Sequence, residues 1–229
     1  MRLDWTSILS QTGWLSRTPA PFREAMLTRA TIQRLEKGEP AYHLHDPPGG
    51  LWGIVSGEVE IELPGMEAEP SIAHFAMPGF WLGEATLIEP TPRRVGVRAT
   101  RPSTLATVSL ADCHAILAAE PAYWRWIALL STMHLDFAMS VAADLLLRDP
   151  HKRTAAMLLR LSGFRNGIFL EPFGVEIQLS HEKLGRLVNL SRNALGPILK
   201  KFVDQKLIHM DYRSIQITDH QGLSDVIGQ

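Results

Sequence analysis

Apolar side chains recur at helical spacing in two short runs between Leu179 and Ile208. This spacing predicts two helices whose apolar stripes face each other across a tight turn. Ser180 and Ser191 stand at the two predicted starts, where a side-chain oxygen accepts from the free N–H groups of the first turn. Asn189 ends the first helix, because asparagine tolerates positive φ. The segment therefore predicts a helix-turn-helix, with stripes formed by Leu184, Leu187, Val188, Leu195, Ile198, Leu199 and Phe202.

A proline disturbs the second of these helices. Pro197 removes the hydrogen bond to the Asn193 carbonyl and crowds that turn, at a cost of about 3 kcal/mol. Gly196 relieves the steric clash with the residue before the proline, but glycine is itself a poor helix former. We therefore expect the second helix to be bent or loosened after its first turn and a half.

Between Ile32 and Val108 the apolar runs are short and are broken repeatedly by Gly and Pro. Alternation is clearest in Val55–Leu63, where valine, isoleucine and leucine face one side and three glutamates face the other. Evenly spaced short strands with turn residues predict a β-roll, barrel or sandwich. An N-terminal helical region precedes it.

A long apolar helix is predicted from Pro121 to Leu147, since proline is favoured at the first helical position. It is apolar on too many sides for an ordinary surface helix and needs two partners. One face can lie on the β-roll, and the other can pair with a second copy as a parallel coiled coil. The alternative is a helix buried in one large domain. The predicted dimer residues are Ile127, Leu130, Phe137 and Val141.

Asp149 and Pro150 then cap and start a new helix, which places a domain boundary there. After the helix-turn-helix, Leu207–Met210 and Ser214–Thr218 predict a two-stranded wing. We thus divide the chain into a β-roll domain (1–120), a long helix (121–147) and a winged-helix domain (148–229).

The charge is unevenly distributed along the chain, although the formal net charge is only −1. Residues 148–229 carry 12 Lys and Arg against 8 Asp and Glu, a net charge of +4, while residues 1–147 carry 11 against 16, a net charge of −5. A basic domain is attracted to phosphate. With the helix-turn-helix, this favours double-stranded DNA as a partner.

Cys113 is the only cysteine among the 229 residues. One cysteine cannot form an internal disulfide or build an iron–sulfur cluster, and it suits a cytoplasmic protein. The N-terminus lacks an apolar run of signal-peptide length, and the long helix is interrupted by Arg125, His134, Asp136 and Asp144. We therefore expect neither export nor a membrane partner.

The order of β-roll, long helix and winged helix resembles the cyclic-AMP receptor protein/FNR (CRP/FNR) family of bacterial transcription regulators, over nearly the whole chain. The resemblance implies an α+β fold with a jelly-roll effector domain, and a homodimer that binds a palindromic site and regulates transcription, with RNA polymerase as a further partner. It rests on Leu179–Ile208 together with His45-Asp46, Ile54–Val59, Gly79–Glu84 and Arg93–Ala99.

In the helix-turn-helix, the resemblance implies that Arg192 reads guanine, because its bidentate donors suit O6 and N7. Asn193 replaces a frequent glutamate and would read another base, such as adenine. Pro197 stands where the best-known member has a second DNA-contacting arginine. The predicted phosphate contacts are Ser180, Ser191, Lys200 and Lys201, although the two lysines fit ordinary solvated side chains equally well.

In the β-roll, the resemblance implies that Gly83 and Glu84 hold a ribose and that Arg93 pairs with a cyclic phosphate. Arg94 departs from the small residue usual at its position, and Ala138 and Met139 replace hydroxyl side chains on the long helix. The effector thus stays open among a cyclic nucleotide, another small molecule and none. His74 keeps haem open as a cofactor, and Glu84 and Arg93 also fit a structural salt bridge.

Two other functions compete with a DNA-binding regulator. A degenerate recognition helix, suggested by Pro197, would act through protein contacts instead of specific DNA binding. A metal-dependent cupin-like enzyme would need His43 and His45 as ligands, but the glutamate of that pattern is missing after them. We therefore expect neither a catalytic residue nor a metal site.

Overall fold

A computed structural model describes residues 5–65, 71–162, 176–177, 179–211 and 214–228. The chain forms two compact units, Met1–Leu135 and Asp136–Gln229. The division falls inside the long helix α6 (Trp124–Leu145).

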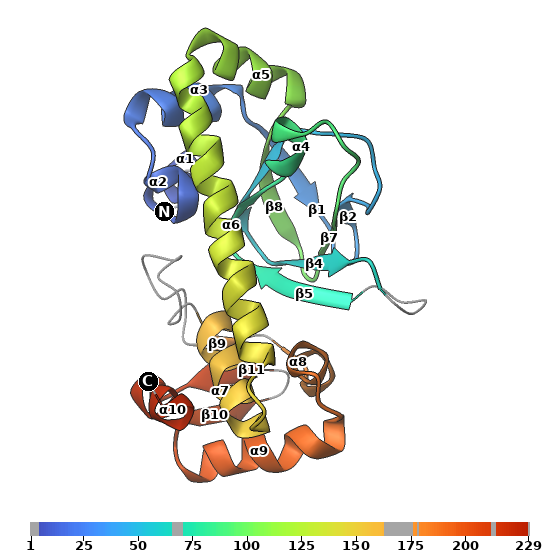
Figure 1. Cartoon of the computed structure of the whole chain (residues 1–229), viewed down its shortest axis with the longest axis vertical. Helices are drawn as coiled ribbons and strands as arrows, with labels where there is room; N and C mark the ends of the chain where they lie inside the picture. The colour runs from blue at the N-terminus through green and yellow to red at the C-terminus, as the bar shows by residue number, and fades with distance from the viewer. Residues whose placement is uncertain (1–4, 66–70, 163–175, 178, 212–213, 229) are drawn as a thin grey trace. The chain divides into compact units, whose positions relative to one another are not determined.

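The first unit contains the expected β-roll, built from two four-stranded antiparallel sheets (Figure 1). One sheet has the order β1-β8-β3-β6 and the other β2-β7-β4-β5. The strands of the first are Thr31–Leu35, Ser103–Val108, Leu51–Ser56 and Trp81–Leu82. Those of the second are Pro40–Tyr42, Gly96–Ala99, Val59–Leu63 and Ser71–Ala76.

The alternation predicted for β4 holds at its start and fades toward its end. Val59 is buried, whereas Leu63 is exposed at the open end of the strand. Glu58, expected on the polar side, is also buried, and its carboxylate accepts a hydrogen bond from the Thr100 hydroxyl there. A buried carboxylate is tolerated where donors satisfy it.

Short helices surround the β-roll in the first unit. They are α1 (Trp5–Gln11), α2 (Gly13–Ser16), α3 (Ala20–Arg29), α4 (Ala85–Ile88) and α5 (Leu110–Ala119). Sequence analysis did not separate α5 from the strand region, although Ser109 caps it by accepting from the Asp112 N–H at 3.0 Å. A 3-10 turn at Pro121–Tyr123 leads into α6, so the long helix starts three residues later than predicted.

The second unit is a winged helix that begins as predicted at Asp149, whose side chain accepts from the His151 N–H at 2.8 Å. Its helices are α7 (Pro150–Leu161), α8 (His181–Val188), α9 (Arg192–Asp204) and α10 (His220–Ile227). The two wing strands, β10 (Ile208–Asp211) and β11 (Ser214–Ile217), are confirmed. The sheet order is β10-β11-β9, with β9 (Glu176–Ile177) as an unpredicted third strand. Tyr212 and Arg213 of the predicted wing turn lie outside the described residues.

The expected loosening of the recognition helix is wrong. Helix α9 runs unbroken from Arg192 to Asp204 with Pro197 inside it. Pro197 lies on the exposed side, and a side chain at Gly196 would meet no atom within 4 Å. Because the Asn193 carbonyl is also on that side, water can replace the missing N–H donor.

Candidate functional site

The turn from β6 into α4 positions the predicted effector residues. Gly83 has a φ of +104°, and a Cβ there would lie 2.5 Å from the Gly50 carbonyl oxygen, so only glycine fits. Thr86 donates its hydroxyl to the carbonyls of Gly49 at 2.6 Å and Gly83 at 3.1 Å. These bonds bring the turn against the loop before β3.

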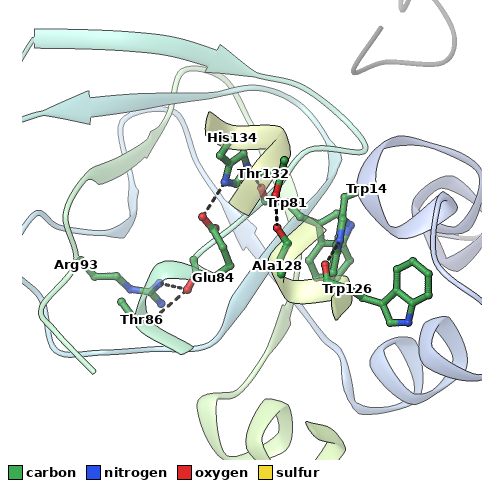
Figure 2. A network of polar contacts seen from close by, with 10 residues as sticks. Trp14, Trp81, Glu84, Thr86, Arg93, Trp126, Ala128, Thr132 and His134 are labelled. Carbon is green, nitrogen blue, oxygen red and sulfur yellow. Dashed lines mark hydrogen bonds and ion pairs between the residues drawn. The ribbon is translucent and has the colours of Figure 1, made fainter. Parts of the chain in front are cut away.

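Arg93 is buried against this turn (Figure 2). Its guanidinium donates to the Gly50 carbonyl at 3.0 Å and to the Gly83 carbonyl at 3.5 Å. The group also stacks over the ring of Tyr42, 4.2 Å from its centroid. Burial lowers the pKa of Arg93 and raises the pKa of the Tyr42 hydroxyl.

Glu84 points away from Arg93, toward α6 (Figure 2). Its Oε1 lies 2.9 Å from Nδ1 of His134, and Nε2 of the same imidazole lies 3.0 Å from the Trp81 carbonyl oxygen. Burial alone would raise the pKa of Glu84, but the hydrogen bond and the charge of His134 lower it below its ordinary value. In the described part of the chain, the ion-pair partner of Glu84 is thus His134 and not Arg93.

The remaining predicted effector residues do not join this cluster within the first unit. Arg94 lies at the surface, where it forms an ion pair with Glu89, so its place in the pocket stays a prediction. Ala138 and Met139 are exposed residues of the second unit, so a contact between them and an effector stays a prediction.

The helix-turn-helix has the predicted local geometry. Ser180 accepts from the Lys183 N–H at 3.2 Å, and Ser191 accepts from the Ala194 N–H at 3.3 Å. Asn189 has φ 52° and ψ 53°, the left-handed conformation expected at the end of α8. The two apolar stripes are buried as predicted.

Sequence analysis missed the role of Gly185 in this turn. A Cβ at that position would lie 2.7 Å from the Leu190 carbonyl oxygen, so the glycine permits the close approach of the turn to α8. A glycine inside an amphipathic helix was the available signal. Beside it is a surface depression of about 390 Å³, lined by Glu182, Gly185, Arg186, Asn189, Leu190, Ser191 and Arg192.

The first turn of α9 presents its polar side chains to solvent. Arg192 and Asn193 are exposed, as are Lys200 and Lys201 further along the helix. The buried stripe of α9 lies on its other side and packs into the domain. Of the predicted DNA-contacting side chains, Ser191, Arg192, Asn193, Lys200 and Lys201 are therefore accessible, while Ser180 is half-buried.

The residues predicted for the dimer face do not share one exposed surface. Ile127 and Leu130 are 1% and 2% exposed and belong to the core of the first unit, which corrects their assignment. Phe137 and Val141 are half-buried in the second unit. The exposed apolar side chains of α6 are instead Trp124, Leu135, Met139 and Leu145, followed by Leu146 just beyond the helix.

His43 and His45, considered as metal ligands, lie in a different part of the chain from His74 on β5, considered as a haem ligand. His43 and His45 follow β2 in an exposed turn in which His45 has a φ of 70°. His74 is buried with its ring 5.6 Å from that of Phe80. Among the described residues there is no group of three or more His, Cys, Asp or Glu side chains placed to hold a metal. Burial raises the pKa of the Cys113 thiol to about 11, which disfavours the reactive thiolate.

Two family models match the chain. The cyclic nucleotide-binding domain matches residues 32–120, and the Crp-like helix-turn-helix domain matches residues 152–226. These ranges fall on the β-roll and on the winged helix.

Similar proteins span most of the chain. The cAMP-activated global transcriptional regulator CRP of Pasteurella multocida is 23% identical over 206 residues, which cover 89% of this chain and 98% of that protein. The transcriptional regulatory protein btr of Bordetella pertussis is 23% identical over 196 residues, which cover 86% and 81%.

Solved structures show the same fold. FixK2 from Bradyrhizobium japonicum matches with a TM-score of 0.75 at 18% identity, over 87% of this chain and 98% of that one. The c-di-GMP responsive global regulator CLP of Xanthomonas campestris matches with a TM-score of 0.67 at 24% identity, over 87% and 99%.

Proposed function

Because the chain belongs to the CRP/FNR family of transcription regulators, we propose that it is a homodimer that binds a palindromic DNA site through helix α9. The observation that carries this proposal is the first turn of α9, where Arg192 and Asn193 stand exposed above a buried stripe. Recognition helices of this type contact base edges with their N-terminal residues.

In this proposal Arg192 reads guanine and Asn193 reads a second base, because their planar side chains can each form two hydrogen bonds to one base. Ser180, Ser191, Lys200 and Lys201 contact phosphates and set the register on the duplex. The net charge of +4 on residues 148–229 adds non-specific attraction.

The dimer face is proposed on the exposed apolar side of α6. Leu135 and Met139, which are four residues apart on the helix, are 60% and 64% exposed. Leu146, just beyond the helix, is 81% exposed. Such a stripe is typical of a helix that pairs with a copy of itself. By length and composition Pro121–Leu145 also resembles a membrane span, but this is weak evidence, because core helices of soluble proteins meet the same criterion.

We assign the protein to the cytoplasm, where it meets DNA and RNA polymerase, on the basis of the family alone. The relatives are named for different nucleotides, cAMP for CRP and c-di-GMP for CLP, so their names do not identify an effector for this chain. The alternative of a degenerate recognition helix is not favoured, because Pro197 leaves α9 unbroken.

Selection of bound sequences from random duplex DNA by the purified full-length protein tests the proposal. We expect enrichment of a palindrome whose half-sites are centred about 10 base pairs apart, or a multiple of that spacing, as two-fold symmetry requires. Repeating the selection with small molecules from a cell extract identifies any dependence on an effector. Recovery of no common sequence under both conditions would contradict specific DNA binding.

A further inference from the structure

The imidazole of His134 contacts three residues of the β-roll, of which Figure 2 shows Glu84 and Trp81. Nδ1 meets the Glu84 carboxylate at 2.9 Å and Nε2 meets the Trp81 carbonyl at 3.0 Å. The ring is stacked on that of Phe80, with centroids 5.2 Å apart and planes 19° apart. A side chain of α6 thus fills the space beside Glu84.

Both ring nitrogens of this imidazole are engaged in hydrogen bonds. A carbonyl oxygen only accepts, so Nε2 donates to Trp81. Nδ1 bonds to the Glu84 carboxylate. The side chains of His134 and Glu84 are only 25% and 11% exposed, so little water competes for the bond between them.

Arg93, by contrast, keeps donors for a ligand. A guanidinium has five N–H groups, and the bonds to the Gly50 and Gly83 carbonyls use two of them. The stacking on Tyr42 holds the group in place. Arg93 therefore remains the candidate for the phosphate-binding half of a nucleotide site, while Glu84, the candidate for the ribose-binding half, is already bonded to His134.

We propose that His134 is the built-in occupant of the Glu84 site and excludes cyclic nucleotides from the β-roll. A ribose hydroxyl can bond to this carboxylate only after the imidazole leaves, which would break both hydrogen bonds of a partly buried ring. Any effector of the proposed regulator is then not a cyclic nucleotide, and His134 provides the link between α6 and the β-roll. This inference rests on the proposed function for its regulatory meaning, but its chemistry can be tested without DNA.

A second contact supports a permanent link. The indole N–H of Trp14 donates to the Trp126 carbonyl of α6 at 2.7 Å, and its ring packs on that of Trp81 at 5.6 Å (Figure 2). Trp81, whose carbonyl binds His134, therefore also packs against Trp14, which is hydrogen-bonded to α6.

The test is calorimetric titration of the full-length protein with cyclic AMP and with cyclic GMP. The wild type should show no saturable binding up to about 1 mM, whereas His134→Ala should gain binding at least about 10-fold tighter than that limit. Adding Glu84→Gln to His134→Ala should abolish the gain. Thr132→Ala, an exposed change on the same helix, is the matched control and should behave as the wild type.

Micromolar nucleotide binding by the wild type, or no gain in His134→Ala, would overturn the proposal. A measurement on the unaltered protein covers the case in which the variant does not fold. In the nuclear magnetic resonance spectrum of the wild type, about 1 mM cyclic AMP should leave the imidazole signals of His134 unchanged, and a saturable shift of those signals would equally overturn the proposal. Neither readout involves DNA, so a failure here is distinct from a failure to select a DNA sequence.

Discussion

Single side chains decide what the helix-turn-helix can recognise. Arg192 is exposed at the start of α9, where a guanidinium can form two bonds to one guanine. Lys200 is exposed two turns later and can contact only the uniformly charged backbone in this proposal. Removing Arg192 should therefore weaken binding by an amount that depends on the DNA sequence, whereas removing Lys200 should weaken binding to all sequences.

We expect Arg192→Ala to weaken binding to the selected palindrome by about 1–3 kcal/mol and to relax the base preference at one position in each half-site. Titration of labelled duplexes that carry every base at each position measures both effects. Lys200→Ala is the comparison, and it should weaken binding to all sequences alike and reduce the salt slope by about 1. Equal losses on every duplex for Arg192→Ala would show that Arg192 does not read a base.

The stability of the first unit should depend on pH through Glu84. Because His134 lowers the pKa of Glu84 in the folded state, the carboxylate stabilises the fold at pH values above 4.5, the ordinary pKa of a glutamate. That contribution is lost as the pH falls through the lowered folded pKa. Arg93 and Tyr42 face the same region but remain in one charge state over this range.

At neutral pH, Glu84→Gln should destabilise the protein by about 1–3 kcal/mol, the usual contribution of a hydrogen bond to a charged group. Urea unfolding at neutral pH and at about pH 4 measures the difference between variant and wild type, which should shrink in acid. Glu89→Gln, which removes an exposed ion-pair partner, should change stability by less than about 0.5 kcal/mol at either pH. A difference independent of pH would contradict the ionised pair.

At the scale of elements, a buried ion pair joins the end of α6 to α7 within the second unit. The side chains of Asp144 and Arg160 are 1% and 2% exposed. Arg160 also donates to the Ser140 carbonyl at 3.1 Å and lies 5.9 Å from the centroid of the Phe137 ring. The last turns of α6 are thus fixed to the winged helix.

Removing one member of such a pair strands a buried charge. We expect Asp144→Asn to destabilise the second unit by about 3–5 kcal/mol, while Asp144→Leu combined with Arg160→Met recovers most of that loss. Denaturant unfolding followed by circular dichroism measures both variants. Glu182→Gln breaks only the exposed pair with Arg186 and should be nearly neutral. A harmless Asp144→Asn would mean that Arg160 is not left as an uncompensated buried charge.

At the scale of the whole molecule, the proposed dimer depends on the exposed side of α6. A charged side chain there would have to be buried without a partner in the dimer, at a high cost. Leu135→Glu and Met139→Glu should therefore yield monomers in sedimentation velocity and weaken binding to the palindrome.

Ile88→Glu is the matched control for these variants, since Ile88 is an exposed apolar residue that belongs to α4 and not to α6. It should leave the wild-type mass unchanged. Dimers in both α6 variants would place the interface elsewhere on the chain.

Much of the fold was predictable from the sequence because its signals are local. The apolar stripes and caps of α8 and α9, the Asp149 cap of α7 and the alternation of β4 each span only a few residues. The missed elements α5 and α10 have equally local caps, at Ser109 and Asp219, which sequence analysis did not weigh.

The candidate sites were predictable only in part. Gly83, Glu84 and Arg93 do lie around one turn of the β-roll, as the resemblance implied. His134 was noticed only as a polar interruption of an apolar helix, because nothing in the sequence indicates that a residue 50 positions away reaches Glu84. Pairing between distant residues is set by packing and not by local spacing.

The sequence by itself determined the order of β-roll, long helix and winged helix, and the caps and apolar stripes of the helix-turn-helix, since periodicity and capping act within a helix or strand. Only the tertiary structure decided which side of α6 is enclosed and which is free, because Ile127 and Leu135 are equally apolar in sequence. It also decided the partner of Glu84, because the packing of α6 against the β-roll brings His134 to that carboxylate before any ligand arrives.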